Sequence, residues 1–341
     1  MEYYMLPASF LIFIPLLFLI VKQLIPKSGN LPPGPRPWPV LGNILQMGKN
    51  PHISLAKFAE IHGPLISVKL GTQLVVVASS PHSAAEILKT QDRLLSARSP
   101  PSVVPHELSV IDQHSIVFSS DLNNHWKFLR AFCRTHLFSP KAELMGAGSD
   151  TTTSTIEWAM TELLRNKGAM HKLQAELTSK FGENDTITES NISELPYLAA
   201  CVKETLRLHS PTPFLIPRRA PETCNIMDYT IPKNSKLFVN AYAIGRDSNT
   251  WEDALCFQPD RFLDSNVDFR GQDFEFIPFG AGRRICPGLG FARQEVHLIL
   301  ASLIHHFKWS LPNDEDPMQL DMEEKFGVTL QKEKPLFIVP M

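Results

Sequence analysis

One loop constrains this chain more than any other stretch of its sequence: residues 279–288, which read FGAGRRICPG. Gly282 and Gly288 permit backbone angles and close approaches that a Cβ atom would forbid. The apolar periodicity of residues 291–304 predicts a helix directly after the loop. Backbone amides that are free at a helix start favour a thiolate over a thiol, here at Cys286. A thiolate held in this way suits a soft or borderline metal, and haem iron is the leading candidate.

The loop matches the pattern Phe-x-x-Gly-x-Arg-x-Cys-x-Gly at Phe279, Gly282, Arg284, Cys286 and Gly288. This pattern is the haem-ligand signature of the cytochrome P-450 family, and the chain resembles that family. A lone cysteine is more often a buried, inert thiol, but five specified residues at fixed spacing make a chance match improbable. The resemblance implies a mainly helical prism with small β-sheets. It also implies a haem cofactor (heme b, with its iron), with Cys286 as the metal ligand.

Composition sets wider limits on the chain. With 341 residues, of which 43% are hydrophobic and 20% charged, it can bury a large core in one or two domains. A net charge of −2 lacks the excess of positive charge that is typical of nucleic-acid-binding proteins. The five cysteines are scattered without a C-x-x-C pair, which indicates a reducing compartment and argues against a disulfide framework or a zinc ribbon.

The N-terminus predicts a membrane anchor over residues 1–26. Residues 3–21 are uncharged and apolar, about the length that a bilayer-spanning helix needs. A cleaved signal peptide is the alternative, but Glu2 precedes the run, and Lys22 and Lys27 follow it without a small-residue cleavage site. The positive-inside rule then places the body in the cytosol. We therefore expect a single-pass protein of the endoplasmic reticulum that contacts membrane lipid.

The prolines of residues 27–45 exclude helix and predict a stiff extended spacer between the anchor and the body. An ordinary linker is the simpler interpretation. The stretch also resembles the proline-rich hinge of microsomal family members. Residues 46–341 then form the haem-binding domain. Within it we expect helices at residues 54–61, 81–89, 123–138, 167–181 and 191–208, and strands at 65–70 and 73–77.

Trp126 and Arg130 lie four residues apart, on one face of a predicted helix. Alone, they would read as a surface cation–π pair. The family places the same Trp-x-x-x-Arg where both side chains donate to a haem propionate. The resemblance also places Arg218 and Arg284 on the propionates, and it assigns residues 214–218 and 326–330 to the substrate pocket.

A segment is missing from the middle of the chain. Residues 137–141 resemble the end of one family helix, and residues 147–152 resemble the middle of the long helix that crosses the haem. Family members place several helices between these two points, so the chain lacks roughly 150 residues near positions 141–146. We interpret the gap as a splice variant, a gene-model error or a truncated paralogue.

Asp150 and Thr151 follow the gap as an acid–alcohol pair. Alone, they would be an N-cap signature. Because reduced dioxygen on iron needs ordered protons, the resemblance favours a proton relay instead. Further on, Glu204 and Arg207 lie three apart on a helix with apolar flanks, which indicates burial. The family joins such a pair to a later arginine, here Arg261, as a structural lock. Residues 226–231 and 237–243 are expected to pair as a hairpin.

The implied function is haem–thiolate monooxygenation, in which one atom of O2 enters a small lipophilic substrate. Electrons would come from an NADPH-dependent flavoprotein reductase. Residues 240–247, 277–287 and 326–331 resemble plant monoterpenoid hydroxylases and, less closely, benzylisoquinoline-alkaloid hydroxylases. Two alternatives remain: an inactive haem-binding truncated variant or pseudoenzyme, and a reductase-independent isomerase or dehydratase. The Asp150–Thr151 pair argues against the isomerase, which has no use for proton delivery to dioxygen.

Overall fold

The computed structural model describes residues 30–98, 115–120, 122–133, 135, 147–182 and 185–341. The predicted anchor, residues 99–114 and the junction at 141–146 lie outside these residues. Within the described ranges, no helix is both long and apolar enough to cross a membrane.

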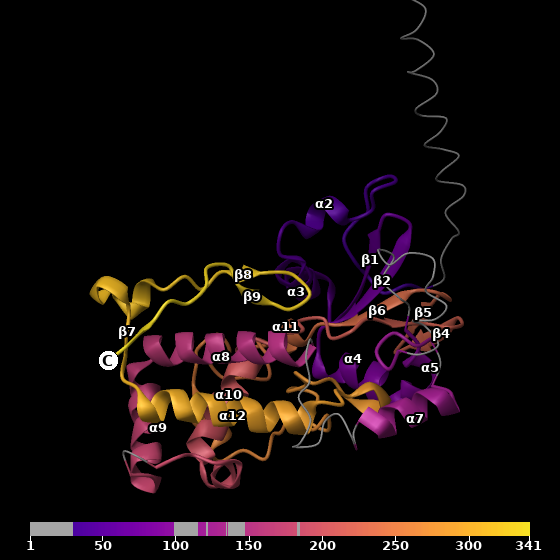
Figure 1. Ribbon diagram of the computed structural model, residues 1–341. Helices are drawn as coiled ribbons and strands as arrows, with labels where there is room; N and C mark the ends of the chain where they lie inside the picture. The colour runs from indigo at the N-terminus through magenta and orange to yellow at the C-terminus, as the bar shows by residue number, and fades with distance from the viewer. Residues whose placement is uncertain (1–29, 99–114, 121, 134, 136–146, 183–184) are drawn as a thin grey trace, which may run out of the picture.

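Four long helices pack together on one side of the molecule (Figure 1). They are α8 (Ala147–Arg165), α9 (Lys167–Lys180), α10 (Pro196–Leu208) and α12 (Leu289–His306). Each packs on the other three. Leu163, Leu173 and Leu300 are fully buried in the core that they share. The helix predicted at 167–181 is confirmed, and the helix predicted at 191–208 begins later, at Pro196, after a 3-10 segment at Glu189–Glu194.

A four-stranded sheet lies beside the helices, in the order β1-β2-β6-β3. β1 (Leu65–Leu70) and β2 (Gln73–Ala78) form the predicted hairpin. β6 (Lys236–Val239) runs parallel to β2, and β3 (Arg218–Arg219) pairs antiparallel with β6. The sheet therefore brings Arg218 next to chain segments far away in sequence.

The hairpin expected between 226–231 and 237–243 is wrong. β4 (Cys224–Ile226) instead pairs with β5 (Tyr229–Ile231), while β6 joins the larger sheet. Both runs are short and apolar, so the strand signal identifies them without fixing their partners. Residues 241–244 of the second run form the short helix α11 (Ala241–Ile244), because Asn240 caps it by accepting from the amide of Ala243 at 3.1 Å.

The remaining described elements are short. The helices are α2 (Ile44–Met47), α3 (Pro51–His62), α4 (Pro81–Ala85), which continues as a π-helical turn at Glu86–Thr90, α5 (Asp92–Leu95) and α7 (Asn124–Phe132), with 3-10 turns at Pro259–Phe262, Gly282–Arg284, Pro312–Asp314 and Pro317–Gln319. The strands are β7 (Trp309–Ser310), β8 (Glu324–Lys325), β9 (Gln331–Lys332) and β10 (Val339–Pro340); β7 pairs with β10, and β8 with β9.

The proline-rich segment does not form a free spacer where it is described. Ser67 on β1 donates from its amide to the carbonyl of Pro33 at 2.9 Å and from its hydroxyl to that of Pro32 at 2.7 Å. A Cβ atom on Gly34 would lie 2.0 Å from the Ser67 carbonyl oxygen, so only glycine permits this approach. The segment is extended, as its prolines predict, but it is hydrogen-bonded to the sheet.

Candidate functional site

A cavity of about 470 Å³ lies where the helices meet the sheet. Its walls come from α8, α10, α12, β6, the chain after α10 and the loop at 278–288. Most of the exposed wall is apolar, which is typical of pockets for small molecules and cofactors. Seven of the predicted site residues line it: Arg130, Thr151, Arg218, Phe279, Arg284, Cys286 and Gly288. Trp126 and Asp150 do not.

The cysteine loop is shaped by its glycines. Gly280 and Gly282 have φ values of 72° and 70°, in the left-handed region where glycine is favoured. A Cβ atom on Gly282 would lie 2.2 Å from the carbonyl oxygen of Leu88. The loop closes through the amide of Cys286, which donates to the carbonyl of Phe279 at 2.9 Å. This geometry presents the thiol to the cavity.

Two opposing effects act on the pKa of the Cys286 thiol. Burial raises the pKa of Cys286 above its ordinary value, although the amide of Gly288 and the charge of Arg130 lower it. Desolvation of the anion therefore outweighs the donors at the start of α12. A bound metal ion would reverse the balance, because coordination deprotonates a thiol.

Among the described residues, five arginines line the cavity, and sequence reasoning missed two of them, Arg98 and Arg293. Arg98 is buried, its Nη1 donates to the carbonyl of Val117 at 2.7 Å, and its Nε has no partner in the described structure. Burial lowers the pKa of Arg98, and the charges of Arg284, Arg218 and Arg130 lower it further. The only sequence signal for a role of Arg98 was a positive charge within a stretch rich in leucine, serine and proline.

Backbone carbonyls and one carboxylate hold Arg130, Arg218 and Arg284, whereas Arg293 is exposed. Arg130 donates to the carbonyl of Ile285 at 2.6 Å. Arg284 donates to the carbonyls of Ser96, Ile116 and Ser119 at 3.0, 3.0 and 2.5 Å. Arg218 pairs with Asp92 at 2.8 Å. These contacts orient the guanidinium groups around one space.

Trp126 lies behind this wall. Its indole N–H donates to the carbonyl of Ile116 at 3.0 Å, and its ring lies 4.7 Å from the guanidinium of Arg284 and 5.4 Å from that of Arg130. The cation–π contact inferred from the Trp-x-x-x-Arg spacing is therefore present, but it is buried. In the described structure the indole N–H is directed to the backbone rather than into the cavity.

On α8, the predicted proton pair is divided between two sides of the helix. Thr151 lines the cavity, and its hydroxyl donates to the carbonyl of Gly148 at 3.4 Å, whereas Asp150 is exposed. Adjacent helical residues do not share a face. The next residue, Thr152, was not singled out from the sequence. It donates to the carboxylate of Glu295 on α12 at 3.1 Å, and both line the cavity.

The predicted lock is confirmed in geometry. Glu204 accepts two bonds from Arg207, both at 2.7 Å, and one from Arg261 at 3.1 Å. Arg207 also donates to the carbonyls of Gly245, Ala254 and Cys256. All of its contacts lie away from the cavity, so this cluster supports the scaffold.

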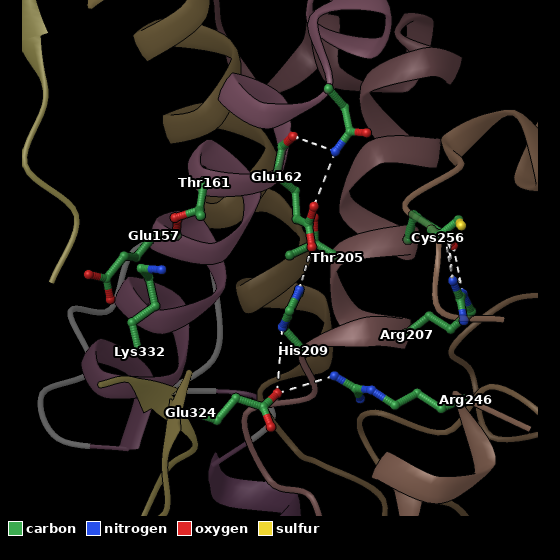
Figure 2. Close-up of polar contacts among 12 residues, drawn as sticks. Glu157, Thr161, Glu162, Thr205, Arg207, His209, Arg246, Cys256, Glu324 and Lys332 are labelled. Carbon is green, nitrogen blue, oxygen red and sulfur yellow. Dashed lines mark hydrogen bonds and ion pairs between the residues drawn. The ribbon is translucent and has the colours of Figure 1, made fainter. Parts of the chain in front are cut away.

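A second buried network was not predicted (Figure 2). The carboxylate of Glu324 lies between His209, at 3.7 Å, and Arg246, at 3.2 Å, and it also contacts His52 at 2.9 Å. His209 reaches Glu162 on α8 at 2.8 Å. The network joins α3, α8, the end of α10 and β8. These residues are distant in sequence, so no local pattern identifies them.

The turn at 326–330 differs from its expected place. None of its residues lines the cavity, and Val328 is 96% exposed. The turn is held at its base, where Leu330 accepts from the hydroxyl of Ser154 at 2.7 Å and donates from its amide to the carbonyl of Pro211 at 2.8 Å. Nothing in the described part of the chain covers its tip.

The cavity has the features that haem requires. It is apolar, it presents a thiol on a glycine-shaped loop, and it is bordered by five arginines, of which Arg98, Arg218 and Arg284 are buried and Arg218 is paired with Asp92. Such a concentration of buried positive charge calls for anions, and haem brings two propionates. The residues present therefore fit the group, with Cys286 in position to bind its iron.

Comparison with known proteins identifies the class. The family model for cytochrome P450 matches residues 32–144 and 141–339. The chain therefore belongs to the cytochrome P450 family, whose members use haem iron as monooxygenases.

Curated relatives come from plants. The chain is 38% identical to the "Probable (S)-N-methylcoclaurine 3'-hydroxylase isozyme 2" of Coptis japonica over 480 residues, covering 97% of this chain and 96% of that protein. It is 37% identical to the (S)-N-methylcoclaurine 3'-hydroxylase isozyme 1 of Papaver somniferum, with 95% and 97% covered. It is 34% identical to the geraniol 8-hydroxylase of Catharanthus roseus, with 97% and 98% covered. The alkaloid hydroxylases are thus more similar than the geraniol enzyme, the reverse of the expected order.

The lengths of these alignments bear on the gap. They run over 480, 475 and 481 residues, against the 341 of this chain. The relatives therefore contain residues that have no counterpart here. The two matches to the family model meet at 141–144, which is where the sequence motifs place the missing segment.

Proposed function

We propose that this chain binds haem through Cys286 and hydroxylates a small lipophilic plant metabolite. One observation carries the proposal: the thiol of Cys286 and five arginines, three of them buried, share the wall of a single, largely apolar cavity. Apolar walls suit a lipophilic substrate, and the arginines suit the carboxylates of the cofactor. When bound, haem supplies the activation of dioxygen, and the thiolate donates electrons that favour O–O cleavage.

The residues around the cavity would divide the binding of the cofactor. Arg130, Arg218 and Arg284 would hold the propionates, and Arg98 is a further donor of the same kind. Trp126 would hold two of these guanidinium groups in place through its ring. In the cysteine loop, Phe279 would pack beside the ligand, and Gly288 would donate its amide to the sulfur.

For proton delivery, we propose that Asp150 and Thr151 act in series. Asp150 faces solvent, where it can take up a proton. Thr151 presents its hydroxyl at the cavity wall. An acid on the outside and an alcohol on the inside can pass protons inward in order.

Cysteine substitutions test the ligand assignment. Cys286→Ala should abolish the thiolate-type spectrum of the reduced carbon monoxide complex. Cys133→Ala is a strict control, because Cys133 also lines the cavity but belongs to the end of α7 rather than to a glycine-shaped loop. Cys201→Ala controls for a fully buried thiol. An unchanged spectrum in Cys286→Ala would refute the assignment.

For its partners, we propose an NADPH-dependent flavoprotein reductase as the electron donor and the endoplasmic reticulum membrane as the site. The uncharged run at 3–21, with lysines on one flank, supports an anchor over residues 1–26 and a cytosolic body. Protease added to intact microsomes should digest the body, and protection of the body would exclude this topology.

A second candidate is a haem-binding variant with little hydroxylase activity. The alignments favour it, because the relatives contain residues that this chain lacks. A reductase-independent isomerase or dehydratase is the other alternative. Omitting the reductase separates it from a monooxygenase, because only an isomerase or dehydratase would still form product.

A further inference from the structure

Asp92 lies between two parts of the cavity wall that are far apart in sequence. It begins the short helix α5, and its side chain is 12% exposed. One carboxylate oxygen, Oδ1, accepts from Nη1 of Arg218 at 2.8 Å. The other, Oδ2, accepts from the backbone amide of Arg283 at 2.9 Å. Arg218 comes from β3, whereas Arg283 lies three residues before Cys286.

The contact with the cysteine loop is close and specific. A Cβ atom on Gly282 would lie 2.9 Å from Oδ1 of Asp92, so the loop reaches this carboxylate only because residue 282 has no side chain. The Arg283 side chain adds an outer ion pair at 3.3 Å and is half exposed. The amide of Arg283 is therefore the inner contact, and it fixes the turn that leads to the thiol.

The contact with Arg218 compensates a buried charge. Arg218 is 4% exposed, and it also donates to the carbonyls of Ala281 at 3.2 Å and Ile87 at 3.5 Å. A buried guanidinium needs a counter-ion, and Asp92 is its only ion-pair partner among the described residues. Both oxygens of Asp92 are thus committed to the cavity wall.

We propose that Asp92 is a positioning residue of the haem site, which sets the cysteine loop and the Arg218 guanidinium at a fixed separation. The inference rests on the proposed function, because it assigns Asp92 a role toward the cofactor. A carboxylate is required, since an amide has one acceptor oxygen and two donor protons. The side-chain oxygen of an asparagine here would accept from either Arg218 or the amide of Arg283. The NH2 group of the asparagine would then face the remaining donor.

The test compares Asp92→Asn with the wild type and with Asp260→Asn. Asp260 is a matched control, because it also pairs with a cation, Lys172 at 2.6 Å, but on the surface. Two quantities are measured on the full chain: the rate of haem dissociation, and the thiolate-ligated fraction of the reduced carbon monoxide complex at equal haem content. Substituting partners that orient a metal ligand costs about 10–100-fold in affinity, so we expect a comparable acceleration of haem loss and a reduced thiolate fraction in Asp92→Asn alone.

A double variant protects the test against misfolding. Asp92→Asn leaves Arg218 buried without its counter-ion, which could unfold the protein. Asp92→Asn combined with Arg218→Gln removes both charges, and replacing both partners costs far less stability than removing one. The turn before Cys286 still loses its carboxylate, so the thiolate fraction should remain low in this variant.

The outcomes separate the two proposals. If Asp92→Asn keeps haem dissociation and the thiolate fraction within about twofold of the wild type, the positioning role is wrong and the haem–thiolate function stands. If the wild type, Asp92→Asn and Asp260→Asn all lack a thiolate spectrum, the proposed function fails and the positioning role fails with it. A loss confined to the two Asp92 variants supports both.

Discussion

At the residue scale, buried ion pairs stabilise the scaffold, and Glu204 links two arginines in one such cluster. It is fully buried and accepts from both Arg207 and Arg261. Removing one partner of a buried ion pair leaves an uncompensated charge, which costs about 3–5 kcal/mol. Glu204→Gln should therefore lower the free energy of unfolding by about this amount, measured by denaturant titration.

Glu194→Gln provides the control for that measurement. Glu194 also pairs with a cation, Lys180 at 3.5 Å, but its side chain is 61% exposed. Exposed pairs contribute little, so this variant should stay within about 0.5 kcal/mol of the wild type. Equal effects of the two substitutions would show that Glu204 does not act as a buried lock.

At the residue scale, the sequence predicts those site residues that belong to a motif. Phe279, Arg284 and Cys286 follow from one pattern, and the structure places all three at the cavity. Arg98 and Asp92 could not be predicted, because their roles depend on residues that lie outside any local motif: Arg98 donates to Val117, and Asp92 pairs with Arg218. The sequence shows the helix start, where the amide of Gly288 lowers the pKa of Cys286, but it does not show the burial that raises this pKa.

At the scale of elements, the carboxylate of Glu324 joins α3, the end of α10 and the chain after α11, which are far apart in sequence. Burial alone would raise the pKa of Glu324, but hydrogen bonds from His209 and His52 and the charge of Arg246 outweigh it, so the pKa is lowered. A lowered carboxyl pKa means that the folded state binds its proton later than the unfolded chain does. The stabilisation is therefore complete above the ordinary carboxyl pKa of about 4.5 and is lost as the pH falls below it.

The substitution Glu324→Gln should accordingly destabilise the protein at pH 7, and the difference from the wild type should shrink as the pH falls below about 4.5. Urea unfolding over a series of pH values measures both. The neighbouring Glu323→Gln is the control, because Glu323 is exposed. A difference that stays constant down to low pH would contradict the assigned charge state.

The elements themselves were predictable where the signal is local. The helix at Lys167–Lys180 and the hairpin of β1 and β2 follow from periodicity and β-propensity. Pairing was not predictable for β6, because a short apolar strand fits several partners and its parallel partner β2 lies more than 150 residues earlier. The turn at 326–330 was expected to line the cavity but does not. Its position depends on the segments that pack against it, and its own sequence does not specify them.

At the scale of the whole molecule, the missing segment sets the expected activity. Val328, Phe128 and Phe132 are exposed by 96%, 63% and 44%. Apolar area left in water forgoes about 25 cal/mol per Å². Water that reaches the iron competes with substrate and diverts electrons from product. We therefore expect weak haem retention and peroxide release in place of most hydroxylation.

Restoring the segment tests this expectation. The chain is expressed beside a version that carries the corresponding residues of a close relative between positions 141 and 146, each with reductase. Product formed per NADPH consumed should be much higher in the restored version, and peroxide should fall by the matching amount. Equal product turnover would show that the gap does not limit the enzyme.

The arginines around the cavity have a consequence for the steady-state amount of this protein in a cell. The charges of Arg284, Arg218 and Arg130 all lower the pKa of Arg98, so these guanidinium groups repel one another across one cavity, and the propionates of haem would offset that repulsion. A ligand that binds only the folded chain stabilises it by mass action, and here it also relieves that repulsion. Chains that open are removed by proteases. We therefore expect the steady amount of this protein to rise and fall with the supply of haem.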